Sequence, residues 1–152
     1  MLNAMTIAHI SDLHFGRIAH PGVVDALVDE INEGRVDLVA LSGDLTQRAR
    51  VSEYEAARAM LDALRPPSLV VAGNHDVHPW WRPIKRLWTP LERYKRYVTD
   101  DLAPTVDTDE VAVLGLTSAY GASIKGGRLR AADRAVLRDH FQGVPDDRFK
   151  VL

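Results

Sequence analysis

The sequence contains no cysteine. That absence excludes disulfide bonds, cysteine-ligated zinc and a thiol nucleophile, so any metal site must use nitrogen and oxygen ligands. No run of about 18 apolar residues occurs, and the amino terminus has no basic segment followed by an apolar one. These two absences argue against a membrane span and a secretory signal, so we expect a cytoplasmic protein with no membrane partner.

An excess of charge of one sign is also missing. The 19 Lys and Arg residues nearly balance the 21 Asp and Glu residues, which gives a net charge of −2 and predicts no general attraction to nucleic acid. The length of 152 residues and the 46% of hydrophobic residues fit one globular domain with its own core. Residues 149–152 resemble the start of a buried strand, whereas chain ends are usually polar. We therefore expect residues 1–152 to form a single domain that is incomplete at its carboxyl terminus.

Short apolar runs alternate with helical patterns in the first half of the chain. Strands are predicted at residues 5–10, 38–41 and 68–72. One helix is expected from Pro21 and Gly22 to Gly34, and a second from a capping-box pattern at residues 52–55 to Leu64. This alternation predicts an α/β fold with a buried parallel sheet.

The second half of the chain opens with aromatic and basic residues at 79–98, including all three tryptophans. Pro83 and Pro90 break any long helix there, so we expect one short helix at about 91–97. Interleaved aromatic and basic residues can hold single-stranded nucleic acid, but a cap over the site or a subunit contact is the favoured interpretation. A strand at 111–117, a helix at 131–141 and a strand from residue 149 are expected to follow.

Metal-binding side chains follow each of the first three predicted strands. In open α/β sheets, ligands bind at the carboxyl ends of the strands. Each motif alone is common in turns, but their order at three strand ends predicts a site for divalent ions such as Mn, Fe or Zn. The residues concerned are Asp12 and His14 after the first strand, Asp44 after the second, and Asn74, His75 and Asp76 after the third.

These motifs resemble those of the calcineurin-like metallophosphoesterases. The matching segments are Ser-Asp-Leu-His at 11–14, Gly-Asp at 43–44 and Gly-Asn-His-Asp at 73–76, and they look nearest to the class III cyclic-nucleotide phosphodiesterases. The resemblance implies a two-sheet α/β sandwich flanked by helices, of which this chain supplies the first half. The two later histidine motifs of the family are missing and are expected beyond Leu152, so we expect this chain alone to bind metal weakly and to have little activity.

The resemblance also implies a role for each residue. Asp12, His14 and Asp44 would bind the first metal ion, and Asp44 would bridge to a second ion that Asn74 also binds. His75 would contact the phosphate and help to protonate the leaving oxygen. The calcineurin-type phosphatases usually continue from Gly-Asp towards an Asp-Arg-Gly segment, but residues 45–48 are Leu-Thr-Gln-Arg, so no acidic group can be assigned from this loop to orient His75.

The expected function is that of a metal-dependent phosphoesterase, a phosphodiesterase or a phosphatase. A hydroxide that bridges two divalent ions would attack phosphorus in line, while the ions offset developing negative charge. The expected partner is a small phosphoester, with nucleotides among the candidates, and a homo-oligomer stays open. Two alternatives are a nuclease-type phosphodiesterase and a non-catalytic scaffold that binds another protein.

The other histidines are not expected to replace the missing motifs. His9 lies inside the first strand and is expected to be a packed or hydrogen-bonded core residue, whereas His140 is expected on the surface. His20 and His78 lie in loops that could reach the site, and His20 is the better candidate to face the substrate.

Overall fold

A computed structural model describes residues 5–18, 20, 22–122 and 127–152, so Pro21 lies outside the described residues. Within these ranges, none of the helices combines the length and the apolarity needed to cross a bilayer. The elements, in chain order, are β1 (Ile7–Ile10), α1 (Gly22–Glu33), β2 (Leu38–Ser42), α2 (Val51–Ala63), β3 (Ser68–Val71), a short 3₁₀ turn η1 (Asn74–Asp76), α3 (Pro83–Trp88), α4 (Glu92–Tyr97), β4 (Thr105–Asp107), β5 (Val111–Leu114), α5 (Ala131–Gln142) and β6 (Phe149–Val151).

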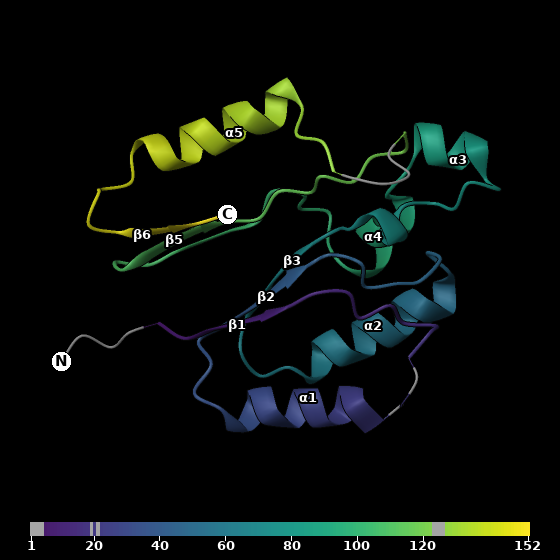
Figure 1. Cartoon of the computed structure of the whole chain (residues 1–152), viewed down its shortest axis with the longest axis horizontal. Helices are drawn as coiled ribbons and strands as arrows, with labels where there is room; N and C mark the ends of the chain where they lie inside the picture. The colour runs from purple at the N-terminus through teal and green to yellow at the C-terminus, as the bar shows by residue number, and fades with distance from the viewer. Residues whose placement is uncertain (1–4, 19, 21, 123–126) are drawn as a thin grey trace.

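The first sheet is parallel, in the order β1-β2-β3. Its central strand, β2, is covered on both faces, which explains its continuous apolar run: Leu38 and Val39 are fully buried, and Leu41 nearly so. Helices α1 and α2 pack below this sheet (Figure 1). The larger hydrophobic core lies between these helices and the first sheet and contains Tyr54 and Val70. The predicted parallel α/β arrangement is therefore confirmed.

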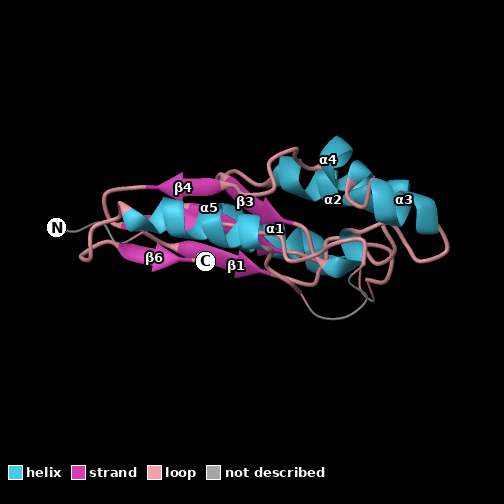
Figure 2. Cartoon of the chain, turned by 90° about the horizontal axis from the view of Figure 1, so that it is seen from above, coloured by secondary structure: helices cyan, strands magenta, loops and turns pink. Residues whose placement is uncertain are grey.

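The second sheet contains β4, β5 and β6, with β5 in the middle. Strand β4 is antiparallel to β5, whereas β6 is parallel to it. This sheet lies over the first one, with α5 on its outer face (Figures 1 and 2). Leu38 and Leu69 of the first sheet pack against Val111 and Val113 of the second. The molecule is thus a two-sheet α/β sandwich flanked by helices, as predicted.

Residues 79–98 form two short helices rather than the single one predicted. Pro83 is the first residue of α3 and does not interrupt a helix. The N–H group at the first helical position makes no hydrogen bond within the helix, so proline, which lacks this group and has a fixed φ, is well suited to that position. The segment has six Arg and Lys residues and one Glu, a net charge of +5, although the whole chain carries −2. The fold therefore concentrates positive charge around α3 and α4.

The start of α2 also differs from the prediction. The helix begins at Val51, and Glu53, rather than Glu55, satisfies the backbone before it. The Glu53 carboxylate accepts the N–H groups of Arg48 at 2.8 Å and Arg50 at 3.1 Å. Because Glu53 is buried, these bonds fix the loop that runs from β2 to α2.

Candidate metal centre

The carboxyl ends of the three parallel strands bring three polar side chains together. Metal-binding atoms of His14, Asp44 and His75 all lie within 4.8 Å of one another. The rings of His14 and His75 meet edge to face, with their centroids 4.8 Å apart. These residues follow β1, β2 and β3 respectively, so the parallel topology alone places them at one edge of the sheet.

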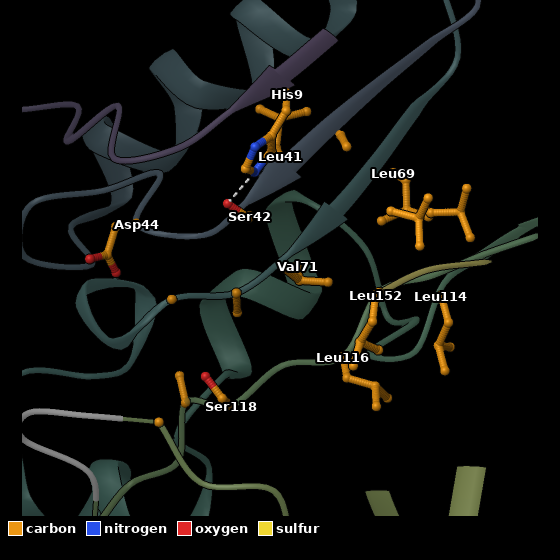
Figure 3. A pocket seen from close by; sticks show the side chains of 18 of the residues that line it. His9, Leu41, Ser42, Asp44, Leu69, Val71, Leu114, Leu116, Ser118 and Leu152 are labelled. Carbon is orange, nitrogen blue, oxygen red and sulfur yellow. Dashed lines mark hydrogen bonds between the residues drawn. The ribbon is translucent and has the colours of Figure 1, made fainter. Parts of the chain in front are cut away.

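Asp12 and Asn74 border this cluster without belonging to it. The Asp12 Oδ1 atom lies 3.5 Å from His14 Nε2, and the Asp12 side chain is largely exposed. Asp12, Asn74 and Asp44 all line a cavity of about 700 Å³ between the two sheets. Figure 3 shows Asp44 at one end of this cavity and Leu152 towards the other. All four predicted metal ligands therefore lie at the same sheet edge as His75.

Three of the predicted ligands have an unusual backbone conformation. Asp12, His14 and Asp44 have φ values of 57°, 48° and 52°. This left-handed region is uncommon for non-glycine residues and costs them about 1–3 kcal/mol, and residues held in it cluster at functional sites. Backbone hydrogen bonds hold the conformation in place, since Asp12 N–H donates to the Gly43 carbonyl at 3.2 Å and His14 N–H to that of Asp44 at 3.0 Å.

Two glycines allow the loops after β2 and β3 to approach each other. A Cβ atom on Gly43 would lie 2.8 Å from the Gly73 Cα, and a Cβ atom on Gly73 would overlap the Asp44 carboxylate and amide nitrogen. Gly43 also has a φ of +100°, which glycine adopts without strain. The close approach lets the His75 N–H donate to Asp44 Oδ1 at 2.9 Å.

Asp76 connects the same two loops from inside the protein. Its buried carboxylate accepts the N–H groups of Leu45 at 3.2 Å, Thr46 at 2.9 Å and Gly73 at 2.9 Å, and the Thr46 hydroxyl at 3.0 Å. Burial raises the pKa of Asp76 to about 6, although these hydrogen bonds oppose the rise. Asp76, which the sequence places beside the metal-binding side chains, is instead bonded to three backbone N–H groups and to the Thr46 hydroxyl.

A main-chain carbonyl orients His75. The His75 Nδ1 atom lies 2.7 Å from the Gln47 carbonyl oxygen. Because a carbonyl oxygen can only accept, Nδ1 carries the hydrogen and Nε2 stays available for a metal or a substrate. The sequence offered no signal for this contact, since every residue has a carbonyl group and only the fold selects the one that faces His75.

Two of the remaining histidines differ from their predicted environments. His9 is exposed, not part of the core, and its Nε2 atom lies 2.8 Å from the Ser42 hydroxyl beside the inter-sheet cavity. His140 was expected on the surface, but only 13% of its side chain is exposed, 3.6 Å from Asp107. His20 is exposed on the loop before α1.

His78 is buried under residues 79–98, which we call the cap segment, rather than at the candidate metal centre. Its side chain is 1% exposed, with Nε2 3.4 Å from the Glu92 carboxylate. The Arg86 guanidinium donates to the His78 carbonyl at 2.5 Å, and the His78 N–H donates to the Pro90 carbonyl at 3.0 Å. Burial lowers the pKa of His78. This histidine therefore anchors α3 and α4 to the turn after β3.

The side chains at the sheet edge suit a divalent cation. The His14 Nδ1 atom is buried and has no hydrogen-bond partner among the described residues. An unsatisfied buried polar atom costs about 1–3 kcal/mol, which a coordinate bond to a metal would remove. The mixture of imidazole and carboxylate is typical of sites for Zn, Fe and Mn. The cluster is therefore compatible with a divalent metal.

A model of the calcineurin-like phosphoesterase family matches residues 5–150. The chain belongs to the calcineurin-like phosphoesterase family. Its relatives include a glycerophosphodiester phosphodiesterase, GpdQ, of Enterobacter lignolyticus, which is 36% identical over 113 residues, 65% of this chain and 41% of that protein. A probable cyclic nucleotide phosphodiesterase of Synechococcus is 32% identical over 81 residues, 47% of this chain and 31% of that protein. The chain thus spans less than half the length of these relatives.

The fold has a counterpart among solved structures. A purple acid phosphatase from yellow lupin seeds superimposes with a TM-score of 0.63 at 11% sequence identity, over 93% of this chain and 28% of the phosphatase. At this identity the likeness concerns the fold alone. It confirms the metallophosphoesterase-type sandwich that the sequence motifs implied.

Proposed function

We propose that this chain carries the metal-binding part of a phosphodiesterase that acts on a small phosphodiester. Membership of the calcineurin-like phosphoesterase family supports a metal-dependent phosphoesterase in general, and the names of two relatives point to diesters. The observation that carries the proposal is the convergence of His14, Asp44 and His75 within 4.8 Å. A substrate phosphate at this edge would meet the imidazoles and the carboxylate together.

The proposed ligands are Asp12, His14, Asp44 and Asn74. Asp12 and His14 lie side by side and would hold a first ion with one oxygen of Asp44. The carboxylate of Asp44 would reach a second ion near Asn74, which borders the same cavity. When bound, two divalent ions of the Mn, Fe or Zn type would polarise the phosphoryl group and offset the developing negative charge.

We assign His75 to the leaving group. The Gln47 carbonyl holds Nδ1, so the imidazolium form would present its other proton, on Nε2, to a departing alkoxide. The proximity of His75 to His14 and Asp44 also suits a metal ligand. If His75 protonates the leaving group, loss of its imidazole would lower turnover. If His75 is a metal ligand, the same loss would lower the amount of bound metal.

The bridging role of Asp44 gives the direct test. In a full-length protein that carries this chain, we expect hydrolysis of bis(p-nitrophenyl) phosphate in the presence of Mn, and a loss of at least about 100-fold in Asp44→Asn, because both proposed ion sites lose a charged ligand. Asp29→Asn is the matched control, since Asp29 is exposed on α1, and it should keep the original rate. Full activity in Asp44→Asn would overturn the two-ion proposal.

A further inference from the structure

A second cavity, of about 470 Å³, lies beside His75 on the side of the cap segment. Asn74 and His75 line part of it, and the indoles of Trp80 and Trp81 line another part. The cavity therefore connects the proposed reacting position with an aromatic wall. A substrate whose phosphorus lies near His75 would place its leaving group in this space.

The aromatic wall is made of two indoles that the protein leaves largely uncovered. Trp80 is 75% exposed and Trp81 is 48% exposed. Their rings meet edge to face, with centroids 5.8 Å apart and planes at 84°. Two neighbouring tryptophans this exposed leave a large apolar area in water, which a planar ligand would cover.

Positive charge accompanies the aromatic wall. Arg48 and Arg86 line the same cavity. Arg48 is exposed, whereas Arg86 is held by the His78 carbonyl. The whole segment 79–98 carries a net charge of +5. Aromatic faces combined with guanidinium groups are the combination that binds a ring joined to a phosphate.

We propose that Trp80 and Trp81 select phosphodiesters with a planar aromatic leaving group, either an aryl group or a nucleoside. The ring stacks on the indoles, and the phosphate lies between Asn74, His75 and Arg48. This inference rests on the proposed function, because it names the substrate class of that same site. It differs from the glycerol substrate in the name of the GpdQ relative, since a glycerol group offers no ring to stack.

Binding can be tested without turnover or metal, because all three tryptophans lie in residues 79–98. In a Trp88→Phe variant, fluorescence excited at the indole band comes from Trp80 and Trp81 alone. Phenyl phosphate and adenosine monophosphate should each give a saturable change, and the tighter binder of the two identifies the aryl or the nucleoside source. Glycerol 3-phosphate should bind at least about tenfold more weakly, since stacking on an aromatic side chain contributes roughly 1–3 kcal/mol.

Kinetics of a full-length protein that carries this chain, measured in Mn, give the second test. Trp81→Leu should lower kcat/KM for bis(p-nitrophenyl) phosphate by about 10-fold or more and leave a glycerophosphodiester within about twofold, because leucine fills space without a ring face. Trp81→Phe should restore most of the loss. Trp88→Leu is the matched control, because Trp88 is also exposed but lies against a different cavity with Lys95 and Arg96.

The outcomes separate this inference from the proposed function. Equal effects of Trp81→Leu on aryl and glycerol diesters, or equal binding of phenyl phosphate and glycerol 3-phosphate, would overturn the aromatic selectivity while hydrolysis survives. Selective aromatic binding without any Mn-dependent hydrolysis would overturn the proposed function and leave the inference standing. Fluorescence that changes with protein concentration but not with any phosphate would identify a contact between copies and also overturn the inference.

Discussion

The shortest contact of the His75 ring is to a main-chain carbonyl, which no side-chain motif encodes. The Gln47 carbonyl receives the Nδ1 hydrogen at 2.7 Å, and the backbone N–H of His75 donates to Asp44. The backbone contact with Asp44 holds the main chain of His75, and the contact with Gln47 holds its ring. An imidazole held in this way loses little freedom when it meets a substrate, which favours proton transfer.

Substitution of His75 separates its two proposed roles. His75→Ala should lower kcat for bis(p-nitrophenyl) phosphate by about 10²–10⁴-fold, the usual contribution of general acid catalysis, while the bound Mn measured by elemental analysis stays close to the original content. His20→Ala is the control, since His20 is exposed before α1, and it should change neither quantity. Loss of one whole Mn ion in His75→Ala would show that His75 is a metal ligand.

At the scale of single residues, the sequence predicts which side chains gather at the site but not which groups they contact. The polar residues after each strand could be predicted, because strand ends are marked by apolar runs that stop. The burial of Asp76 and His78 could not, since it depends on which loops and helices pack over them. Trp80 and Trp81 were noticed only as part of a basic and aromatic segment, and their position beside His75 depends on the turn after β3.

At the scale of elements, the contact between the loops after β2 and β3 sets the spacing of the site. Gly43 and Gly73 face each other without room for a Cβ atom on either. Both loops also donate backbone hydrogen bonds to the Asp76 carboxylate, one from the Thr46 N–H and one from the Gly73 N–H. Any residue that separates these loops must also move Asp44 away from His75.

Gly73→Ala tests this contact. Gly73 has a φ of −97°, which alanine tolerates, so the cost would come from the collision with Asp44 and amount to about 1–3 kcal/mol of unfolding free energy. Mn affinity should fall as well, and urea denaturation and a Mn titration measure the two effects. Gly22→Ala is the matched control, because nothing lies within 4 Å of its added Cβ. Equal behaviour of the two variants would contradict the steric argument.

Element types were predicted more successfully than element boundaries. The apolar runs of β2 and β5 and the helical spacing of α1 identified these elements, because each of them buries one face or both. Strand β4 has only three residues and is defined by its pairing with β5, so the local sequence contains no apolar pattern long enough to predict it. Helix α3 was missed because proline can open a helix as well as interrupt one.

Positive and negative charges are unevenly distributed over the molecule. Residues 79–98 carry +5 within a chain of net charge −2, so the remainder is negative, and the positive part adjoins the cavity beside His75. A field of this kind attracts an anionic substrate towards one side of the protein and raises its rate of encounter.

We therefore expect kcat/KM for an anionic diester to fall as ionic strength rises, by roughly threefold between 0.05 and 0.5 M salt. The double variant Lys95→Gln, Arg96→Gln removes two exposed charges of α4 and should reduce this dependence. Arg134→Gln with Arg138→Gln removes the same charge from exposed positions of α5 and should leave it nearly unchanged. Identical salt dependence in both double variants would argue against steering by the cap segment.

The order of strands along the chain has a consequence for folding. The first sheet and both helices that cover it come from one continuous stretch, Ile7 to Val71, and the five proposed site residues all lie between positions 12 and 75. Contacts between segments near in sequence form with the smallest loss of chain entropy. During synthesis from the amino terminus, the five proposed site residues can therefore come together as soon as β3 and its turn have left the ribosome, while the strands of the second sheet are still to be made.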